Sequence, residues 1–388
     1  MTTRTRARSL GLSTGLAGCL VWLSPRLARA EDSVSYKYMD YRESGGRIAV
    51  QTQSALVEQD LGTDLHVKVS GVIDAIAGAT PTGQPAPAGS DQVVLADIHD
   101  RRKAWNLDFS RQFPSTNVAL GFAHSRESDY VSTGWSVNTL TDFNRKNTTL
   151  LAGVAGTDDD VQVFYQSAWA RKRTNELIIG ITQLLDPLTS VTLDVTWSHA
   201  TGYLGDPYKV VQKRTEVNPG DFLNLQFLEN RPRERDKWTA FASLNRAFPA
   251  QHAALEASVR GYHDTFGLNA GTVELTWLQR LGEKLVVQPT FRFYQQGAAD
   301  FYYYQLDGTP IVPLDGPPDP HGPLYSSDYR LSAFRATTCG LKVVWTPTAR
   351  VQLDAAVARY DMRGTDGPTP ASAYPRAIIV SAGFKFSW

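Results

Sequence analysis

The sequence predicts an all-β fold: a transmembrane antiparallel up-and-down β-barrel of about 16 strands with short periplasmic turns and longer extracellular loops. Three observations predict it: an export signal, strand-like alternation along the rest of the chain, and an aromatic C-terminal residue. No run of about 18 apolar residues follows the N-terminus, which excludes a helical membrane protein. A hydrophobic content of 42% excludes a disordered chain. Equal numbers of basic and acidic residues, 39 each, argue against a nucleic-acid partner.

Residues 1–30 have the pattern of a cleavable signal peptide. Arg4, Arg6 and Arg8 precede a largely apolar segment, and the small residues Ala28 and Ala30 mark a cleavage site. The competing interpretation is a lipobox at 16–19, in which Cys19 would be lipidated instead of cleavage after Ala30. Cleavage removes five arginines and no acids, so the domain at 31–388 keeps 34 basic and 39 acidic residues, a net charge of −5. Cys339 is then its single cysteine, which excludes an intrachain disulfide.

The rest of the chain alternates apolar and polar residues with the period of a two-faced strand. The segments 191–198, 350–361 and 376–388 show this most clearly, and no comparable segment has a helical period. Sixteen strands over 358 residues give about 22 residues per strand and connection, which fits spans of about 10 residues. The alternative counts are 14 and 18, because 131–175 is hard to divide. The expected strands are 34–42, 46–57, 64–77, 101–113, 117–131, 143–156, 161–170, 175–185, 190–203, 233–248, 252–266, 269–281, 284–296, 328–346, 350–361 and 376–388.

The connections are of two kinds, as in barrels whose turns face the periplasm and whose loops face outside. The longer loops are expected at 78–98, 204–232, 297–327 and 363–375. The tight turns are expected at Gln59–Thr63, Phe113–Thr116, Thr157–Asp160, Asp186–Thr189, Phe248–Gln251, Gly282–Glu283 and Pro347–Ala349.

The polar face of these strands carries charges in mid-strand. In a soluble β-sandwich or propeller such residues would face solvent, whereas in a barrel they line a wet lumen. Long strands and the terminal aromatic residue favour the barrel. The candidate lumen-lining residues are Lys68, Asp74, Asp108, Asp194, Glu274, Arg292, Lys342, Asp354 and Lys385. Their mixed signs predict little ion selectivity. The net charge of −5 predicts a mild preference for cations.

The outward face predicts contact with lipid and with the machinery that inserts barrels. The last strand places Phe384, Phe386 and the terminal Trp388 on its apolar face, and outer-membrane barrels characteristically end in this way because the insertion machinery pairs with the last strand. The tryptophans on predicted outward positions form an expected aromatic girdle: Trp105, Trp197, Trp277, Trp345 and Trp388. The chain is therefore expected in the outer membrane of a Gram-negative cell, where it should be heat-modifiable on gels.

Several segments resemble the bacterial domain-of-unknown-function 3570 family over essentially the whole mature chain. The stretch from His199 to Val211 resembles its most recognisable segment, although the family often has Ser where this chain has Gly205. The segments 147–150, 127–130, 41–43 and 46–48 are also similar. The resemblance implies an exported outer-membrane β-barrel without an established activity. Members lie near genes for flavin-attaching and thioredoxin-like proteins, which implies a possible periplasmic redox partner.

The segment 202–211 follows a strand and opens a long loop. It is interpreted as a fixed turn at a strand end, or else as a loop folded into the lumen, with Asp206, Tyr208 and Lys209 as a candidate constriction.

No catalytic, metal or cofactor site is predicted. No two histidines have a metal-pair spacing, and Ser198 and His199, as strand neighbours, point to opposite faces. The acidic run 158–160 is interpreted as a solvated turn in preference to a cation site. No phosphate loop, CxxC or haem-attachment motif occurs, so no cofactor is expected.

The leading functional hypothesis is a porin-like channel for small polar solutes, which needs a polar lumen and no catalytic residues. The alternative is a non-catalytic scaffold or sheath for a redox partner, and an outer-membrane enzyme ranks third.

One hairpin tests the facing of the strands. A turn centred on Thr348 would place Lys342 opposite Asp354, with Lys385 beside it, as a lumenal ion cluster. The same register would pair Trp345 with Val351 and Leu341 with Ala355 on the outside.

Overall fold

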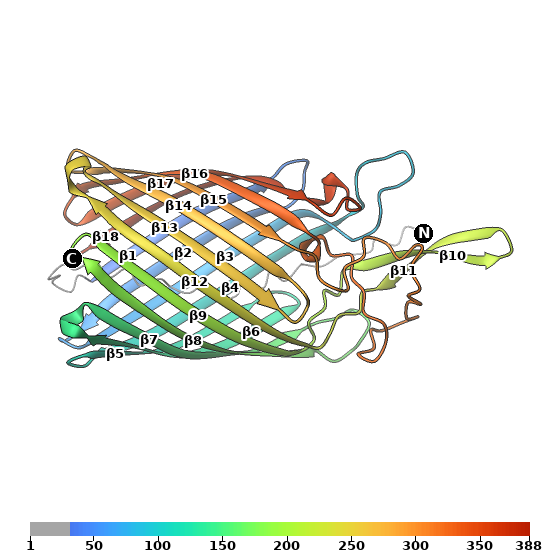
Figure 1. The fold of residues 1–388 in the computed structure, drawn as a ribbon, viewed down its shortest axis with the longest axis horizontal. Helices are drawn as coiled ribbons and strands as arrows, with labels where there is room; N and C mark the ends of the chain where they lie inside the picture. Colours follow the sequence, from blue (N-terminus) through green and yellow to red (C-terminus); the bar gives the residue numbers. More distant parts are fainter. Residues whose placement is uncertain (1–31) are drawn as a thin grey trace.

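The computed structural model describes residues 32–388, so the predicted signal peptide lies outside the described residues. The chain forms a closed barrel of sixteen antiparallel strands, each paired with its sequence neighbour except across β10 and β11 (Figure 1). The barrel strands are β1 (Ser33–Glu43), β2 (Ala49–Leu61), β3 (Leu65–Pro81), β4 (Leu95–Gln112), β5 (Thr116–Arg126), β6 (Tyr130–Phe143), β7 (Thr148–Val161), β8 (Ala170–Asp186), β9 (Thr189–Gly202), β12 (Glu234–Phe248), β13 (Ala253–Asp264), β14 (Asn269–Leu281), β15 (Leu285–Gln296), β16 (Phe334–Thr348), β17 (Val351–Gly364) and β18 (Arg376–Ser387).

The barrel has a turn end and a loop end. Seven short turns and the C-terminus lie at the turn end, while the segments 203–233 and 297–333 lie at the loop end (Figure 1). Two turns contain 3-10 helices, η1 (Asn144–Lys146) and η2 (Pro249–Gln251), and two loops contain η3 (Tyr329–Leu331) and η4 (Ala371–Ala373). Within 32–388 no helix is long and apolar enough to cross a membrane. The all-β barrel and its count of sixteen strands are confirmed.

The two faces of the barrel wall differ in polarity because side chains alternate along every strand. Large exposed apolar side chains occupy the outer face, among them Ile179 at 60% exposure and its cross-strand partner Val195 at 58%. Four of the five predicted girdle tryptophans are exposed on this face, between 38% and 52%, and Trp277 packs against Phe248.

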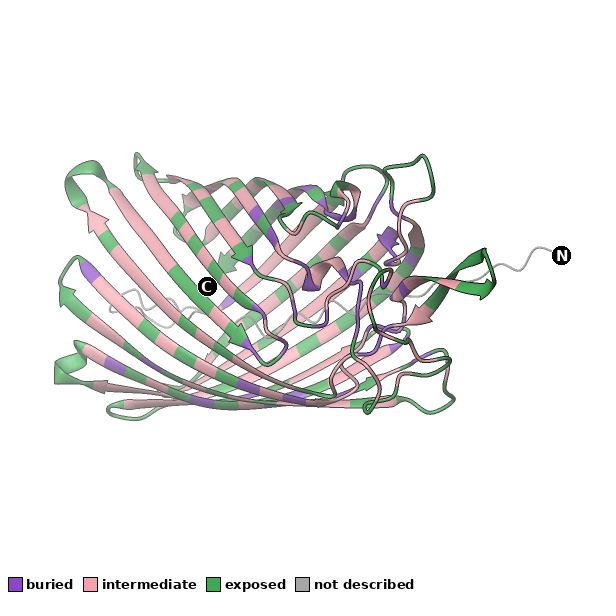
Figure 2. Cartoon of the chain, turned by 45° about the vertical axis from the view of Figure 1, so that its right-hand side comes forward, coloured by how far each residue is buried: buried purple, intermediate pink, exposed green. Residues whose placement is uncertain are grey.

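The buried apolar core lies at the loop end and not in the barrel centre (Figure 2). It consists of three clusters that pack loop residues against one another and against the inner faces of strand ends. Their buried members are Val93, Phe334, Ala336, Met362, Ala373 and Tyr374; Phe266, Leu268, Ala299, Phe301 and Leu331; and Val211, Leu306 and Tyr325.

The expected division of residues 131–175 is wrong. Strand β6 occupies 130–143, the turn follows at 144–147, and residues 162–169 form a loop where a strand was expected. The acidic run 158–160, expected as a tight turn, lies within β7 and faces the basic run Arg171–Arg173 of β8 in register. Asp158 binds Arg173 at 2.7 Å and Asp159 binds Lys172 at 3.0 Å, and opposite charges across two strands stabilise the pair.

Further boundaries differ from the expectation. Strand β3 extends to Pro81 and β4 begins at Leu95, so the loop expected at 78–98 is shorter and spans 82–94. The segment 204–232, expected as a loop, contains a two-stranded ribbon of β10 (Val210–Asn218) and β11 (Asp221–Leu228) that projects beyond the barrel (Figure 1). Strand β16 begins at Phe334, so residues 328–333 belong to the preceding loop instead of the strand.

The predicted cluster of Lys342, Asp354 and Lys385 is wrong, although the facing of the hairpin is retained. The turn is shifted to Ala349-Arg350, and a bulge between Trp345 and Thr348 adds a residue to β16. Trp345 therefore pairs with Leu353, and Lys342 with Ala356. This shift of two residues keeps every side chain on its expected face but changes its partner.

Candidate functional site

All nine predicted lumen-lining residues lie on the face of their strands opposite to the exposed apolar side chains, which is the inner face of the barrel. Asp74 accepts hydrogen bonds from Arg102 and Thr52, both at 2.6 Å. Glu274 lies opposite Arg292, at 3.8 Å. Asp354 lies 3.5 Å from Lys37, across Gly383, and Lys342 lies opposite Gln288 and Ala356.

Glu58 is the centre of a second lumenal group, which the sequence reasoning missed. Its carboxylate lies 3.6 Å from both Lys68 and Lys385 and accepts a hydrogen bond from Ser33. These four residues come from four neighbouring strands, β3, β2, β1 and β18. The strand alternation placed Glu58 on the polar face, but no local signal marked it as the shared partner of two lysines.

Four inner carboxylates have no hydrogen-bond or ion-pair partner among residues 32–388: Asp108, Glu176, Asp194 and Glu256. Asp194 of β9 lies opposite Gly180, where a Cβ atom would approach its Oδ1 too closely. Glu256 of β13 lies opposite Thr276 and Asn245. The wall from β9 to β13 therefore presents two of these carboxylates to the lumen without a counter-ion.

The loop end carries a cap, which we define as the segments 203–233 and 297–333. It crosses the mouth of the barrel and is attached around it (Figure 2). The Lys209 ammonium donates to the carbonyl of Pro81 at the end of β3, Asp300 N–H donates to Phe266 between β13 and β14, and Tyr302 bonds Thr369 between β17 and β18.

The three predicted constriction residues all lie in this cap. Asp206 is buried and binds Arg330 at 2.7 Å, and the Tyr208 hydroxyl donates to Asp129 at 2.6 Å. Lys209 is 1% exposed, and its ammonium lies over the ring of Tyr329, 6.0 Å from the ring centroid. Their contacts join the cap to itself and to the barrel rim.

Six charged residues of the cap form what we call the cap cluster. It contains three cations and three anions: Lys209, Arg231, Arg330, Asp206, Glu229 and Asp328. Asp328 accepts hydrogen bonds from Arg330 Nε at 2.8 Å and Arg231 Nη2 at 2.9 Å. Arg231 also donates to Glu229 at 2.9 Å, and Ser326 donates to the same carboxylate at 2.6 Å. The charges therefore balance within a largely buried site.

The titration of the cluster reflects burial and pairing together. Burial alone would raise the pKa of Asp328, but Arg330 and Arg231 outweigh it and hold that pKa well below its usual range. Burial lowers the pKa of Lys209 and raises that of Glu229. The cluster depends on mutual compensation, because each charge is costly to bury alone.

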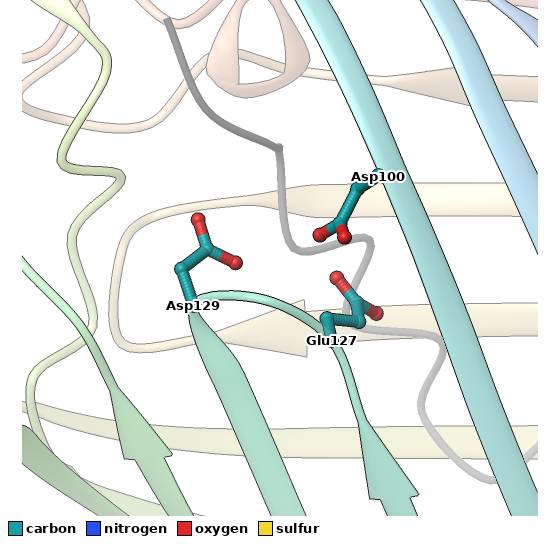
Figure 3. A group of neighbouring side chains, drawn as sticks. All are labelled: Asp100, Glu127 and Asp129. Atoms are coloured by element: carbon teal, nitrogen blue, oxygen red, sulfur yellow. The ribbon is translucent and has the colours of Figure 1, made fainter. Parts of the chain in front are cut away.

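A separate acidic group lies below the cap at the rim. Asp100 of β4 and Glu127 and Asp129 between β5 and β6 place carboxylate oxygens within 4.8 Å of one another (Figure 3). Asp129 anchors Tyr208 of the cap, and Asp100 accepts from Ser128. Glu127 Oε2 is buried without a hydrogen-bond partner among the described residues. Among residues 32–388 these three form the one group of carboxylates whose spacing could hold a metal ion, and the sequence analysis did not predict it.

Glu127 should make stability depend on pH. Burial raises its pKa to about 7, the Asp100 carboxylate adds to the rise, and Arg102 opposes it. The folded-state pKa of Glu127 lies above its unfolded value of about 4.3. The free energy of unfolding is therefore highest below about pH 4.3 and falls as the pH rises from there through about 7. Glu127→Gln is expected to flatten this decline between those pH values. Urea unfolding across that range measures it, and an unchanged slope would contradict the assignment.

The chain is similar over most of its length to several solved structures. The siderophore receptor PirA from Pseudomonas aeruginosa is 12% identical, with a TM-score of 0.43, covering 92% of this chain and 62% of that one. PirA from Acinetobacter baumannii is 11% identical with a TM-score of 0.43, covering 92% and 60%. Pseudomonas aeruginosa OccK5 (OpdH) is 7% identical with a TM-score of 0.43, covering 92% and 98%. The chain spans about three fifths of the two receptors, and at these identities the likeness concerns the fold alone.

Among curated proteins none matches the chain. A family model matches residues 21–371, which include fifteen complete barrel strands and the whole cap. The chain therefore belongs to the family described as protein of unknown function (DUF3570).

Proposed function

We propose that this protein is a porin-like outer-membrane channel for small polar solutes. The observation that carries the proposal is the contrast between the two faces of one closed wall. The outer face is apolar, as lipid requires, and the inner face carries charged residues on strands all around the barrel. A barrel of sixteen strands is wide enough for an aqueous lumen. The turn end then faces the periplasm and the loop end the exterior.

The position of the cap supports the proposal that the solute is small. It lies across the extracellular mouth, where two buried clusters and the cap cluster hold it in place. A solute would pass between these loops and the barrel rim before it meets the charged wall. Large or rigid solutes would be excluded at this point.

Conductance in a planar bilayer tests the proposal. Folded protein, identified by its heat-modifiable mobility on gels, is expected to produce discrete conductance steps. Persistent absence of steps from folded, membrane-inserted protein would contradict the channel and favour a closed, scaffold-type barrel.

The partnerless carboxylates predict a mild cation preference. Asp194→Asn combined with Glu256→Gln is expected to lower the cation-to-anion permeability ratio by roughly a factor of two, since lumenal charges act on passing ions at the scale of a few kT. The reversal potential across a salt gradient measures the ratio. The control, Asp158→Asn with Asp160→Asn, also removes two charges, but from the outer face of β7. Equal shifts in both variants would refute a local effect of the lumen.

A further inference from the structure

Five arginines gather on the outer face at the loop end of four neighbouring strands, β16, β17, β18 and β1. We call them the arginine rim: Arg42, Arg335, Arg359, Arg363 and Arg376. All five are exposed. Each shares its face with apolar residues lower on the same strand, such as Leu341 on β16, Val357 on β17 and Val380 on β18. The rim is therefore continuous with the outer surface that would meet lipid.

The height of the rim matches the boundary of a bilayer. Arg335 lies ten residues along β16 from Trp345, and Arg363 lies ten residues along β17 from Leu353, the cross-strand partner of Trp345. With about 3.3 Å per residue and a strand tilt of about 40°, ten residues span roughly 25 Å along the barrel axis. This is the height of the apolar band of such barrels. Arg335 and Arg363 then lie at the level of the outer-leaflet headgroups.

The charges of the rim are not balanced within the protein. Asp40 binds Arg42 at 2.8 Å, and Asp361 binds Arg363 at 2.7 Å and lies 3.6 Å from Arg376. Two carboxylates thus face five guanidinium groups, a surplus of three positive charges. Moreover, Arg335 is the direct cross-strand partner of Arg363. Like charges at such close positions destabilise a sheet unless an anion lies between them.

On the opposite side of the barrel, the outward charges at the loop end are paired. On β7 and β8 the outward Asp158 and Asp160 face Arg173 and Arg171 in register, so each arginine there has its own carboxylate. The surplus of arginines on β16–β1 is therefore absent from β7 and β8.

We propose that the arginine rim binds phosphate groups of lipid headgroups in the outer leaflet. Guanidinium groups bind phosphate through paired N–H donors, and a headgroup phosphate would lie between Arg335 and Arg363 and offset their repulsion. Their aliphatic stems would lie along the acyl-chain boundary, as amphipathic side chains do at interfaces. This inference rests on the proposed outer-membrane location but not on conductance.

Lipid retention tests the rim independently of transport. The folded barrel is equilibrated in micelles that contain phosphatidic acid and phosphatidylcholine with the same acyl chains, and bound lipids are counted by native mass spectrometry. The wild type is expected to retain phosphatidic acid preferentially. Arg335→Gln with Arg363→Gln is expected to weaken that retention roughly tenfold, equivalent to about 1.4 kcal/mol.

A matched control removes the same number of charges from the paired side. Arg171→Gln with Arg173→Gln is expected to change retention by less than about twofold, because on that side each outward arginine has its own carboxylate and no surplus of positive charge attracts a phosphate. Equal loss in both variants would show bulk attraction only, and no loss in either would remove the rim as a binding site. Both results overturn the proposal.

A lysine variant and a competition experiment complete the test. Arg335→Lys with Arg363→Lys keeps the charge and the fold if the glutamine variant does not fold, and is expected to lose part of the retention because lysine lacks the paired donors. Inorganic phosphate is added to the wild type as a competitor. Displacement of the lipid by inorganic phosphate would overturn the assignment to a headgroup, and retention in its presence supports it.

Discussion

Asp328→Asn is expected to release the cap and to make it the first part of the protein that a protease cleaves. Asp328 is 1% exposed and accepts hydrogen bonds from both Arg231 and Arg330. The substitution keeps the shape of the side chain but leaves three cations with two anions in a buried site. Removing one partner of a buried ion pair costs about 3–5 kcal/mol. That cost falls on the cap, because the barrel strands pair with one another without it.

The measurement is limited proteolysis of the folded protein, with the heat-modifiable band as a control for the barrel. Cleavage within 203–233 or 297–333 should become faster by two orders of magnitude or more, in proportion to the population of the open form. In bilayers the same variant should show a larger and noisier conductance. Asp315→Asn, an exposed carboxylate on the same loop, is the matched control and should behave as the wild type.

A second substitution distinguishes charge balance from a merely disturbed loop. Arg231→Met in the Asp328→Asn background restores equal numbers of cations and anions in the cap cluster. The two changes should therefore be less harmful together than the sum of their separate effects, with a coupling of about 0.5–3 kcal/mol. Strict additivity would show that the cluster does not act as a unit.

The barrel could be predicted from the sequence because its signal is local and repeated. Alternation assigns each strand its two faces without any knowledge of the partner strand, and every candidate lumenal residue lies on the face that this rule gives. The rule failed at 157–160, because three consecutive aspartates resemble a solvated turn when β8 is not considered. Their partners Arg171–Arg173 are visible in the sequence, but their pairing depends on a loop of unpredictable length at 162–169.

The cap could not be predicted for a different reason. Arg231 meets Asp328 across 97 positions and Arg330 meets Asp206 across 124, and no periodicity links residues so far apart. The segment Tyr325–Asp328 consists mostly of polar residues and is expected as the end of a loop and the first residue of a strand, yet all four residues are buried. Its polar side chains Ser326 and Asp328 bond to the cap cluster and not to solvent. Likewise, the register of β16 and β17 depends on one bulge, which alternation cannot detect because it preserved the faces.

Val195→Lys should destabilise the membrane-inserted protein by about 2–4 kcal/mol, while Thr196→Lys should have little effect. Val195 lies near the middle of β9 between Ile179 of β8 and Ala240 of β12, on the outer face. A lysine there would place its charge in the lipid midplane, where that cost is expected. Thr196, the next residue, lies on the inner face between Ile178 and Thr239, where a lysine reaches the aqueous lumen.

Both variants add one positive charge and have nearly the same β-strand environment. The free energy of unfolding in urea, measured in lipid vesicles, therefore reports the facing alone. Equal destabilisation by the two lysines, or a greater loss from Thr196→Lys, would overturn the assignment of the two faces and with it the aqueous lumen that the proposed channel requires.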